Sequence, residues 1–271
     1  MRVVSFNING VRARPHQLEE LKLKYDPDVI GLQETKVHDE EFPREFIESL
    51  GYHVEYYGQK GHYGVALLSK TPPLSVIRGL PSEDESSQRR LITGVYQMAN
   101  GEEITIMNGY FPQGENRSHE TKFPHKERFY RELTDWLNVS FTPKQSLLVI
   151  GDINISATDN DIGIGSSNAK RWLREGKCSF LPEEREWLSS LESWGLRDGY
   201  RKIHPNNSDK FSWFDYRSKG FSAEPKRGLR IDALLATDSI YDRIIASDIA
   251  YDIRGMEKPS DHAPIWIEIK D

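Results

Sequence analysis

A carboxylate and a carboxamide directly follow a short apolar run in this sequence, and such a pair suits the chemistry of an oxygen-liganded metal. Residues 147–151 read Leu-Leu-Val-Ile-Gly, and Asp152-Ile-Asn154 comes next. A run this short and apolar predicts a strand that is buried on both faces. Alternation along that strand would place Asp152 and Asn154 on one side. Asp and Asn also end strands in ordinary Asx turns, so the pair alone leaves both interpretations open.

Polar residues of the same kind end or interrupt other predicted strands. The full set is Asn7, Glu34, Asp152 with Asn154, Asp232, and Asp261 with His262. Asp232 interrupts an apolar run, where an unpaired carboxylate would be costly. Pro259 and Pro264 fix the backbone on either side of the Asp261-His262 pair. The recurrence favours a shared site over a series of unrelated turns.

Together these positions predict an acidic centre for a hard divalent cation. Mg²⁺ binds through one or two carboxylates and keeps several of its waters. Zinc is disfavoured because the chain has one cysteine, Cys178, and no HExxH-type spacing. A single cysteine also excludes an internal disulfide and indicates a reducing compartment.

Strand and helix patterns alternate along the chain, and these elements must position the polar residues. Strands are predicted over 2–7, 28–34, 54–57, 65–69, 90–96, 104–110, 147–151, 229–235 and 263–269. Helices are predicted from residue 15, over 42–50, over 124–139, around 170–174 and from residue 182. No repeat or linker divides the chain, so we expect a single domain over residues 1–271. The alternation predicts a four-layer α/β sandwich, with two packed mixed sheets flanked by helices.

The charge is unevenly distributed. The whole chain has a formal charge of −6, whereas residues 170–230 hold 14 Lys and Arg against 9 Asp and Glu, a local balance of +5. An acidic body with a basic segment permits binding of nucleic acid. No apolar run approaches the roughly 18 residues of a membrane span, and the N-terminus lacks the apolar stretch of a secretory signal. We therefore expect a cytoplasmic protein with no membrane partner.

Six short motifs extend from one end of the chain to the other, and five of them contain the polar residues named above. They read Asn7-Ile-Asn-Gly-Val-Arg-Ala-Arg14, Ile30-Gly-Leu-Gln-Glu-Thr-Lys36, Asn108-Gly-Tyr-Phe-Pro-Gln-Gly114, Gly151-Asp-Ile-Asn154, Leu229-Arg-Ile-Asp232 and Ser260-Asp-His-Ala-Pro264. In this order they resemble the motifs of the exonuclease III family of the deoxyribonuclease I-like superfamily. Residues 178–187 and 211–221 also resemble exonuclease III. The resemblance implies an enzyme that hydrolyses phosphodiesters in DNA with a bound Mg²⁺ or Mn²⁺.

The resemblance also implies which residues hold the metal. Glu34 is the expected principal ligand, and Asn7 and Asp261 lie nearby, with Asp152 and Asn154 at the same centre. Asp152 is expected to position and deprotonate the attacking water. Its reference pKa of about 3.9 makes it a weak base unless burial and neighbouring carboxylates raise that pKa. Other groups therefore remain open as the base.

Further site residues are implied as stabilisers of the phosphate. Asn154 is expected to donate to the phosphate oxygen on which negative charge grows, a preorganised-donor role. His262, oriented by Asp232, is expected to do the same, either as a cation or as a neutral donor. Tyr110 is expected either to assist the leaving oxygen or to hold the phosphate.

Recognition of DNA is expected to involve basic and aromatic residues. The candidates for phosphate contacts, which give affinity but little sequence information, are Arg90, Lys122, Arg174, Lys177 and Arg217. Trp213, Phe214 and Leu229 are candidates for the walls of a pocket that takes a flipped-out abasic sugar. Each basic residue alone also fits a solvated surface, and the two aromatic residues also fit core packing.

The expected partner is double-stranded DNA with abasic sites or 3′ ends, bound by a monomer. The resemblance implies cleavage 5′ of abasic sites, 3′→5′ removal of nucleotides and cleaning of blocked 3′ ends, and the sequence does not rank these activities. A phosphoinositide or sphingomyelin phosphodiesterase would share the centre, and only recognition elements such as Arg89-Arg90 and Trp213-Phe214 favour DNA over it. A non-catalytic DNA-binding module would be expected to lack some of the implied catalytic residues, and all are present.

Overall fold

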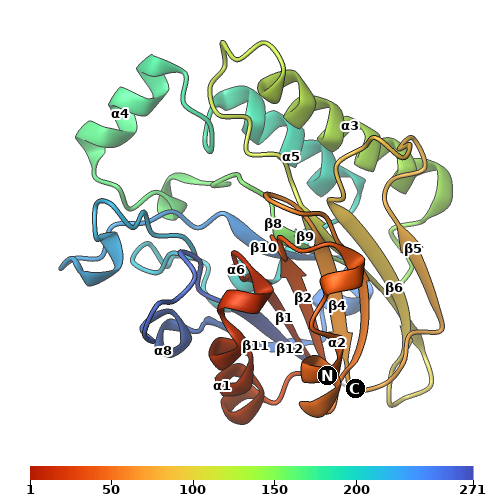
Figure 1. The fold of residues 1–271 in the computed structure, drawn as a ribbon. Coiled ribbons are helices and arrows are strands. Elements are labelled where there is room, and N and C mark those ends of the chain that lie inside the picture. Colours follow the sequence, from red (N-terminus) through yellow and green to blue (C-terminus); the bar gives the residue numbers. More distant parts are fainter. Residues whose placement is uncertain (271) are drawn as a thin grey trace.

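The computed structural model describes residues 1–270 and contains two six-stranded sheets (Figure 1). The first has the order β11-β12-β1-β2-β4-β3 and is built from β1 (Arg2–Asn7), β2 (Val29–Gln33), β3 (His53–Tyr57), β4 (Val65–Ser69), β11 (Ile244–Ile249) and β12 (Ile265–Ile269). The second has the order β5-β6-β7-β8-β10-β9 and is built from β5 (Ser75–Arg78), β6 (Leu91–Gln97), β7 (Glu103–Tyr110), β8 (Leu147–Asp152), β9 (Arg197–Asp198) and β10 (Asp232–Ala236). Both sheets are mixed, because β1 runs parallel to β2 and β7 runs parallel to β8 while the remaining pairs are antiparallel.

Helices cover the outer face of each sheet (Figure 1). The α-helices are α1 (Pro15–Tyr25), α2 (Arg44–Ser49), α3 (Lys122–Ser140), α4 (Ser166–Glu175), α5 (Pro182–Trp194), α6 (Gly199–Ile203), α7 (Asp238–Tyr241) and α8 (Tyr251–Arg254). Short 3-10 turns occupy Val11–Ala13, Asp39–Glu41, Asp159–Asp161 and Gly220–Ser222. Helices α3 and α5 pack on the second sheet, and α1, α2 and α8 pack on the first. Over residues 1–270, no helix combines the length and the apolar character that crossing a bilayer would require.

Three apolar layers hold the sandwich together. The central layer lies between the sheets, where Val65 and Leu67 belong to the same buried cluster as Leu148 and Ile150. A second layer joins the second sheet to Leu133 and its neighbours on α3, and a third joins the first sheet to α1. β8 is accordingly buried at every position and begins with four apolar residues, Leu147 to Ile150, as the run over residues 147–151 predicted.

A polar side chain ties the two sheets together inside the central layer. Asn108 of β7 is fully buried, and its Nδ2 donates to the carbonyls of Leu32 and Ala66 in the first sheet, each at 2.9 Å. Its Oδ1 accepts from Nε2 of Gln33 at 2.6 Å. A Cβ at Gly31 would lie 2.7 Å from Asn108 Oδ1, so glycine is needed for the sheets to approach this closely. These bonds fix the position of β2 in the first sheet relative to β7 in the second.

The predicted four-layer sandwich is confirmed, with differences at several element ends. The helix expected over 42–50 begins only at Arg44, because Phe42 is extended and Pro43 occupies the position before the helix. The strand expected over 229–235 begins only at Asp232, because Leu229 pairs instead with Trp213 in an isolated bridge. Strands β5, β9 and β11 were not anticipated, since β9 has two residues and β5 is largely exposed.

Asn108→Ala should lower the free energy of unfolding by about 2–4 kcal/mol, because it leaves buried carbonyls unpaired at about 1–3 kcal/mol each. Urea denaturation at neutral pH measures the change. The matched control is Asn100→Ala, which removes an exposed turn amide bonded to Glu102 and should cost less than about 0.5 kcal/mol. Equal values for the two variants would show that the tie between the sheets contributes nothing.

Candidate active site

The polar residues that the sequence places at strand ends meet at one edge of the sandwich. β1 ends at Asn7, β2 ends directly before Glu34, β7 ends at Tyr110 and β8 ends at Asp152. Strand register aligns Tyr110 and Asp232 with Asp152 from either side. Asp261 and His262 lie a few residues before β12, which begins at Ile265 and is antiparallel to β1, so they reach the same edge. Residues more than 250 positions apart thus share one site. Apart from Asn154, all of the predicted catalytic and metal-binding residues meet there, namely Asn7, Glu34, Tyr110, Asp152, Asp232, Asp261 and His262.

Asn7 joins two of the predicted metal ligands. Its Nδ2 donates to Oε1 of Glu34 and to Oδ2 of Asp152, both at 2.9 Å. The other oxygen of Glu34 lies 2.9 Å from the ammonium of Lys36. Two carboxylates therefore converge on one small region, and a nearby cation already balances part of their charge.

His262 bridges two buried aspartates. Its Nδ1 lies 2.8 Å from Oδ2 of Asp232, and its Nε2 lies 3.7 Å from Oδ2 of Asp152. Burial alone would lower the pKa of His262, but the charges of Asp232 and Asp152 outweigh burial and raise the pKa to about 10. The imidazole therefore carries a proton on both nitrogens at neutral pH, which makes it a cationic donor. Burial in turn raises the pKa of Asp152 above its usual range, with His262 opposing that shift.

Asn154 is not placed by strand alternation. β8 ends at Asp152, and Asn154 adopts a left-handed backbone with φ of 54°. This conformation is tolerated better by asparagine than by most residues. The Nδ2 of Asn154 donates to the carbonyl of Phe111 at 2.9 Å, which leaves its second amide hydrogen for another acceptor. The expectation that Asp152 and Asn154 share one side of a continuing strand was therefore wrong in its geometry, because the chain turns between them.

Asp261 is linked to the aromatic residue Trp213. One of its carboxylate oxygens accepts from Nε1 of Trp213 at 3.0 Å, and the other accepts from Nδ2 of Asn9 at 2.9 Å. Burial would raise the pKa of Asp261, but the charge of His262 and these two bonds lower it. Asp261 is therefore ionised, and both of its oxygens are already occupied by donors from the chain.

Tyr110 packs under the guanidinium of Arg90. The Arg90 carbon lies 4.8 Å from the Tyr110 ring centre and 4.6 Å from that of Tyr63, and its NH1 donates to the Tyr110 carbonyl at 2.9 Å. Burial, reinforced by the charges of Glu34 and Asp152, raises the pKa of Tyr110 well above its usual value, so its hydroxyl stays protonated. Arg90 is only 6% exposed, which places it in the wall of the site rather than among solvated surface charges.

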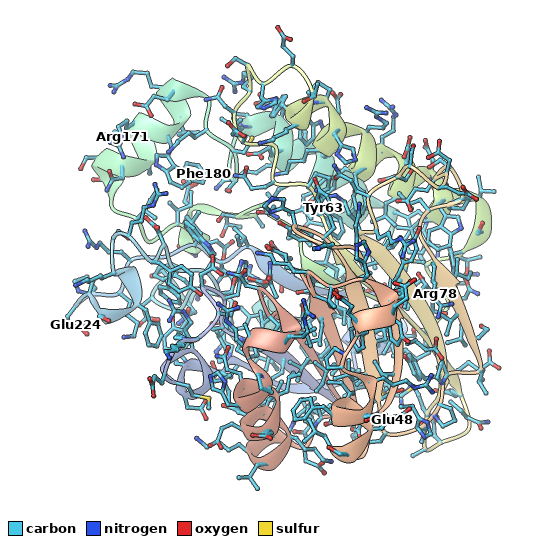
Figure 2. The ribbon with its side chains drawn as sticks, viewed as in Figure 1. Glu48, Tyr63, Arg78, Arg171, Phe180 and Glu224 are labelled. Carbon is cyan, nitrogen blue, oxygen red and sulfur yellow. The ribbon has the colours of Figure 1, made fainter. Side chains whose placement is uncertain are left out.

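The other predicted DNA contacts lie apart from this centre. Lys122, Arg174, Lys177 and Arg217 are exposed. Lys122 pairs with Glu115, and the Lys177 ammonium lies 4.8 Å from the ring centre of Trp172. Arg174 lies on α4, an outlying helix with no buried residue, from which Arg171 also projects (Figure 2).

Of the three predicted pocket residues, Trp213 alone lines an open cavity. Phe214 is fully buried and packs edge-on against Phe221 and Tyr251, so the structure favours the core-packing alternative for it. Leu229 is also buried, and its backbone pairs with that of Trp213 through bonds of 2.9 and 3.0 Å. Leu229 therefore holds the Trp213 backbone in place from the buried side and does not form an exposed wall of the cavity.

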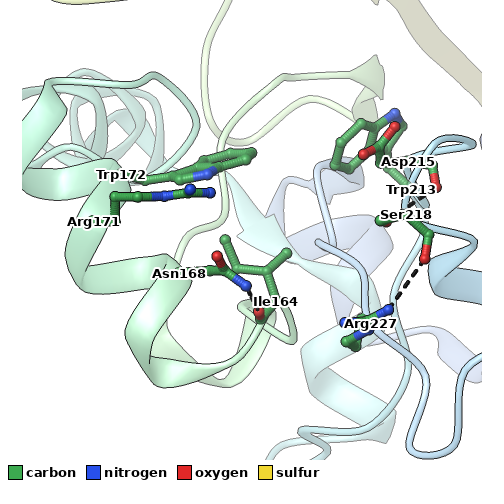
Figure 3. A pocket seen from close by; sticks show the side chains of 8 residues that line it. All are labelled: Ile164, Asn168, Arg171, Trp172, Trp213, Asp215, Ser218 and Arg227. Atoms are coloured by element: carbon green, nitrogen blue, oxygen red, sulfur yellow. Dashed lines mark hydrogen bonds between the residues drawn. The ribbon is translucent and has the colours of Figure 1, made fainter.

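The cavity beside Trp213 has a volume of about 170 Å³ and lies between α4 and the segment around residues 213–227 (Figure 3). Its lining residues are Ile164, Asn168, Arg171, Trp172, Trp213, Asp215, Ser218 and Arg227. Within residues 1–270, Arg171 and Arg227 form no ion pair, and NH2 of Arg227 donates to the carbonyl of Ser218 at 3.1 Å (Figure 3). Two tryptophans and two guanidinium groups, against the single carboxylate of Asp215, make the cavity suited to a ligand that combines flat or apolar parts with negative charge.

Several residues around the site were missed by sequence reasoning. Asn9 and Lys36 connect Asp261 to Glu34, because Lys36 Nζ lies 2.5 Å from Asn9 Oδ1. Ser260 Oγ donates to the Asn7 carbonyl at 2.6 Å, and Ser212 Oγ accepts from the backbone N–H of Asp232 at 3.1 Å. Asn9, Lys36 and Ser260 fall inside the quoted motifs, which was the available signal, whereas Ser212 lies outside those motifs and gives none.

Comparison with known proteins assigns the chain to a family. A family model described as the endonuclease/exonuclease/phosphatase family matches residues 4–262. The chain belongs to this family. Exodeoxyribonuclease III of Haemophilus influenzae is 58% identical over 270 residues, and the match covers all of both chains. The chain is accordingly a hydrolase, of the exodeoxyribonuclease III type.

Solved structures agree with this assignment. A 3′–5′ exonuclease from Neisseria meningitidis has 31% identity and a TM-score of 0.90, and an AP endonuclease from Archaeoglobus fulgidus has 32% identity and a TM-score of 0.90. A 3′ phosphatase from Neisseria, bound to a product DNA hairpin, has 30% identity and a TM-score of 0.89. Each match covers all of both chains, so the deoxyribonuclease I-like fold expected from the sequence is confirmed.

The family depends on divalent metals, and the donor set of this site fits such an ion. Asp152, Asp232 and His262 each offer an atom within 4.8 Å of the others. The raised pKa of His262 keeps that imidazole protonated, which makes it a poor ligand. Glu34 and Asp152 instead bring hard carboxylate oxygens to one place on either side of the Asn7 amide, and this is the ligand type that Mg²⁺ and Mn²⁺ prefer.

In metal-free protein, Asp232→Asn should lower the free energy of unfolding by about 3 kcal/mol at pH 7, because it breaks a buried ion pair. The folded-state pKa of His262, about 10, lies above its unfolded value, so the stabilisation is fully present below pH of about 6.5. It is lost as the pH rises through about 10, where wild type and variant should converge.

Urea denaturation of both proteins at pH 7 and at pH 10.5 tests this. The control is Asp238→Asn, which removes an exposed ion pair with Arg197 and should cost at most about 1 kcal/mol at either pH. A gap between wild type and Asp232→Asn that stays constant with pH would contradict a charged His262.

Proposed function

We propose that this chain is a DNA repair nuclease that uses Mg²⁺, which Mn²⁺ can replace, to hydrolyse phosphodiesters at abasic sites and 3′ ends of duplex DNA. The observation that carries the proposal is the convergence of Glu34 and Asp152 on Asn7, opposite a cationic His262. In that arrangement the two carboxylates provide negative charge for a cation, and His262 provides positive charge for a phosphate. We further propose that a monomer acts through one domain, since the site draws on residues from both ends of the chain.

Glu34 and Asp152 would hold the ion, which supplies a water of lowered pKa and polarises the phosphate, and Asn7 would orient both carboxylates through its amide nitrogen. Asp261 would not contact the ion directly, because its two oxygens already accept hydrogen bonds from Trp213 and Asn9. Asn154, with one free amide hydrogen, would face the phosphate rather than the ion.

Asp152 would take the proton of the attacking water. Burial raises its pKa, which makes it a stronger base than a solvated aspartate. His262 and Asn154 would donate to the phosphate oxygen on which negative charge grows, and such preorganised donors act without reorganisation. Tyr110 keeps its proton and so would act as a donor, either to the phosphate or to the leaving oxygen.

The cavity beside Trp213 would provide the selection for abasic sites. A sugar without a base unstacks at little cost and can swing out of the duplex against the aromatic wall of Trp213. Arg171 and Arg227, which have no ion-pair partner among residues 1–270, would receive the neighbouring phosphates. A small-molecule phosphodiesterase of the same fold is the second candidate, but two guanidinium groups flanking an aromatic wall favour a polyanionic strand.

Metal dependence is the first test of this function. Wild-type protein should cleave an abasic-site duplex faster than an intact duplex in Mg²⁺, and excess EDTA should abolish both activities. Glu34→Gln should raise the metal concentration for half-maximal rate by about 10- to 100-fold, the usual effect of disturbing the ligand environment of a metal. The control Glu41→Gln changes an exposed carboxylate that pairs with Arg12 and should behave as wild type. Undiminished cleavage in EDTA would reject the proposed function.

Trp213→Ala should slow abasic-site cleavage by about 10- to 100-fold, because a lost aromatic contact is worth about 1–3 kcal/mol. Trp213→Phe keeps a flat ring but loses the indole N–H that bonds Asp261, and it should retain most of the activity. The measurement is kcat/KM on the abasic duplex, with circular dichroism to confirm folding. If the phenylalanine variant is as slow as the alanine variant, the bond to Asp261 and not the aromatic wall is what matters.

A further inference from the structure

α3 directs two buried polar side chains toward the loop that follows Asp152. Lys126 and Tyr130 are one helical turn apart, so they lie on the same face of α3, and neither is more than 1% exposed. The Tyr130 hydroxyl donates to the Ile153 carbonyl at 2.6 Å. The Lys126 ammonium donates to the Asn154 carbonyl at 2.8 Å. Two consecutive carbonyls of this loop are thus held from one helix.

Each polar group in this arrangement is fully satisfied. The three donors of Lys126 meet three acceptors: the carbonyl of Asn154, the carbonyl of Gln113 at 3.2 Å and Oε1 of Glu184 at 2.6 Å. The second oxygen of Glu184 accepts from the backbone N–H groups of Ser179 and Leu181, both at 2.8 Å. A fully buried ion pair with all of its bonds made is rigid, because any shift leaves a buried charge unpaired.

The loop held in this way has a backbone that needs support. Asn154 is in the left-handed region, which for a non-glycine residue persists only when its surroundings fix it. The Asn154 amide must also face a phosphate within hydrogen-bond distance to stabilise the transition state. A small rotation about the Ile153–Asn154 peptide would move that amide without changing the position of β8.

We propose that Lys126 and Tyr130 are positioning residues for the reaction, which hold the left-handed turn at Asn154 and thereby aim its side chain. This inference rests on the nuclease function proposed above. Neither residue touches the substrate, and both act through the backbone of the loop. A purely structural role would affect stability alone, whereas a positioning role must affect kcat through Asn154.

The test uses Tyr130→Phe, which deletes one hydroxyl and keeps the ring. The matched control is Tyr52→Phe, because the Tyr52 hydroxyl is also buried and donates to a backbone carbonyl, that of Pro27, at 2.9 Å. Both variants should lose similar stability in urea denaturation. On a duplex with 3′ ends in Mg²⁺, Tyr130→Phe should lower kcat by about tenfold with little change in KM, since small displacements of catalytic groups are costly. Tyr52→Phe should leave kcat as in wild type.

Coupling to Asn154 is measured with a double-mutant cycle. In an Asn154→Ala background, Tyr130→Phe should lower kcat by less than about twofold, because the side chain that it aims is gone. The paired change Lys126→Met with Glu184→Gln removes both buried charges together and should also lower kcat more than KM. Lys126→Met alone would leave Glu184 unpaired and is expected to unfold the chain.

Three outcomes are decisive. Tenfold losses that vanish in the Asn154→Ala background support the proposal. Equal kcat values for Tyr130→Phe and Tyr52→Phe, or the same loss with and without Asn154, overturn it while the proposed function stands. A wild-type protein that cleaves no DNA overturns the proposed function and this inference together.

Discussion

The burial of several carboxylates at one edge of the sandwich is the constraint on which the site depends. Each of these groups would be costly to desolvate alone. The chain compensates them with His262 between Asp152 and Asp232, Lys36 beside Glu34, and the amide of Asn7 between two carboxylates. These compensating groups lie on or beside strands of the first sheet, whereas Asp152 and Asp232 lie on strands of the second, so the charges and the packing of the two sheets stabilise one another. Burial raises the pKa of Asp152, whereas the charges of Asp232 and Asp152 outweigh burial and raise the pKa of His262, and these shifts suit a base and a cationic donor.

The distances at this edge are set by the packing of the sheets. Asn7 and Glu34 belong to the first sheet, whereas Asp152 and Asp232 belong to the second. Asn108 and its partners fix the separation of the sheets a short way below the site. From outside, α3 holds the loop after Asp152, so the site is supported both from the core and from the outer layer. Chemistry of this kind tolerates little misplacement, which explains why it is built on strands rather than on long loops.

The cavity proposed for recognition, by contrast, lies on less constrained parts of the molecule. The cavity beside Trp213 is bounded by α4, which has no buried residue, and by an irregular segment that includes Arg227. Trp213 connects the two regions, since its side chain lines the cavity while its indole N–H bonds Asp261 at the edge of the centre. A ligand bound against Trp213 would therefore contact a residue that is hydrogen-bonded to Asp261, at the edge of the carboxylate network. This division lets the family vary its substrates while the centre stays the same.

The sequence by itself determined the fold class, most strands and helices, and the polar residues at strand ends, because apolar periodicity and local motifs are short-range signals. It also indicated hard oxygen ligands, because Glu34, Asp152 and Asn7 can each be recognised as a candidate ligand from residue type and position in the sequence alone. Only the tertiary structure decided that Asn154 turns out of the strand, that Phe214 is core and that Lys126 is buried with Glu184. The protonation of His262 was likewise undecidable from sequence, because its pKa depends on two aspartates that the chain brings close only when both sheets have formed. Each of these features rests on contacts between distant segments, and residue type and spacing carry no record of such contacts.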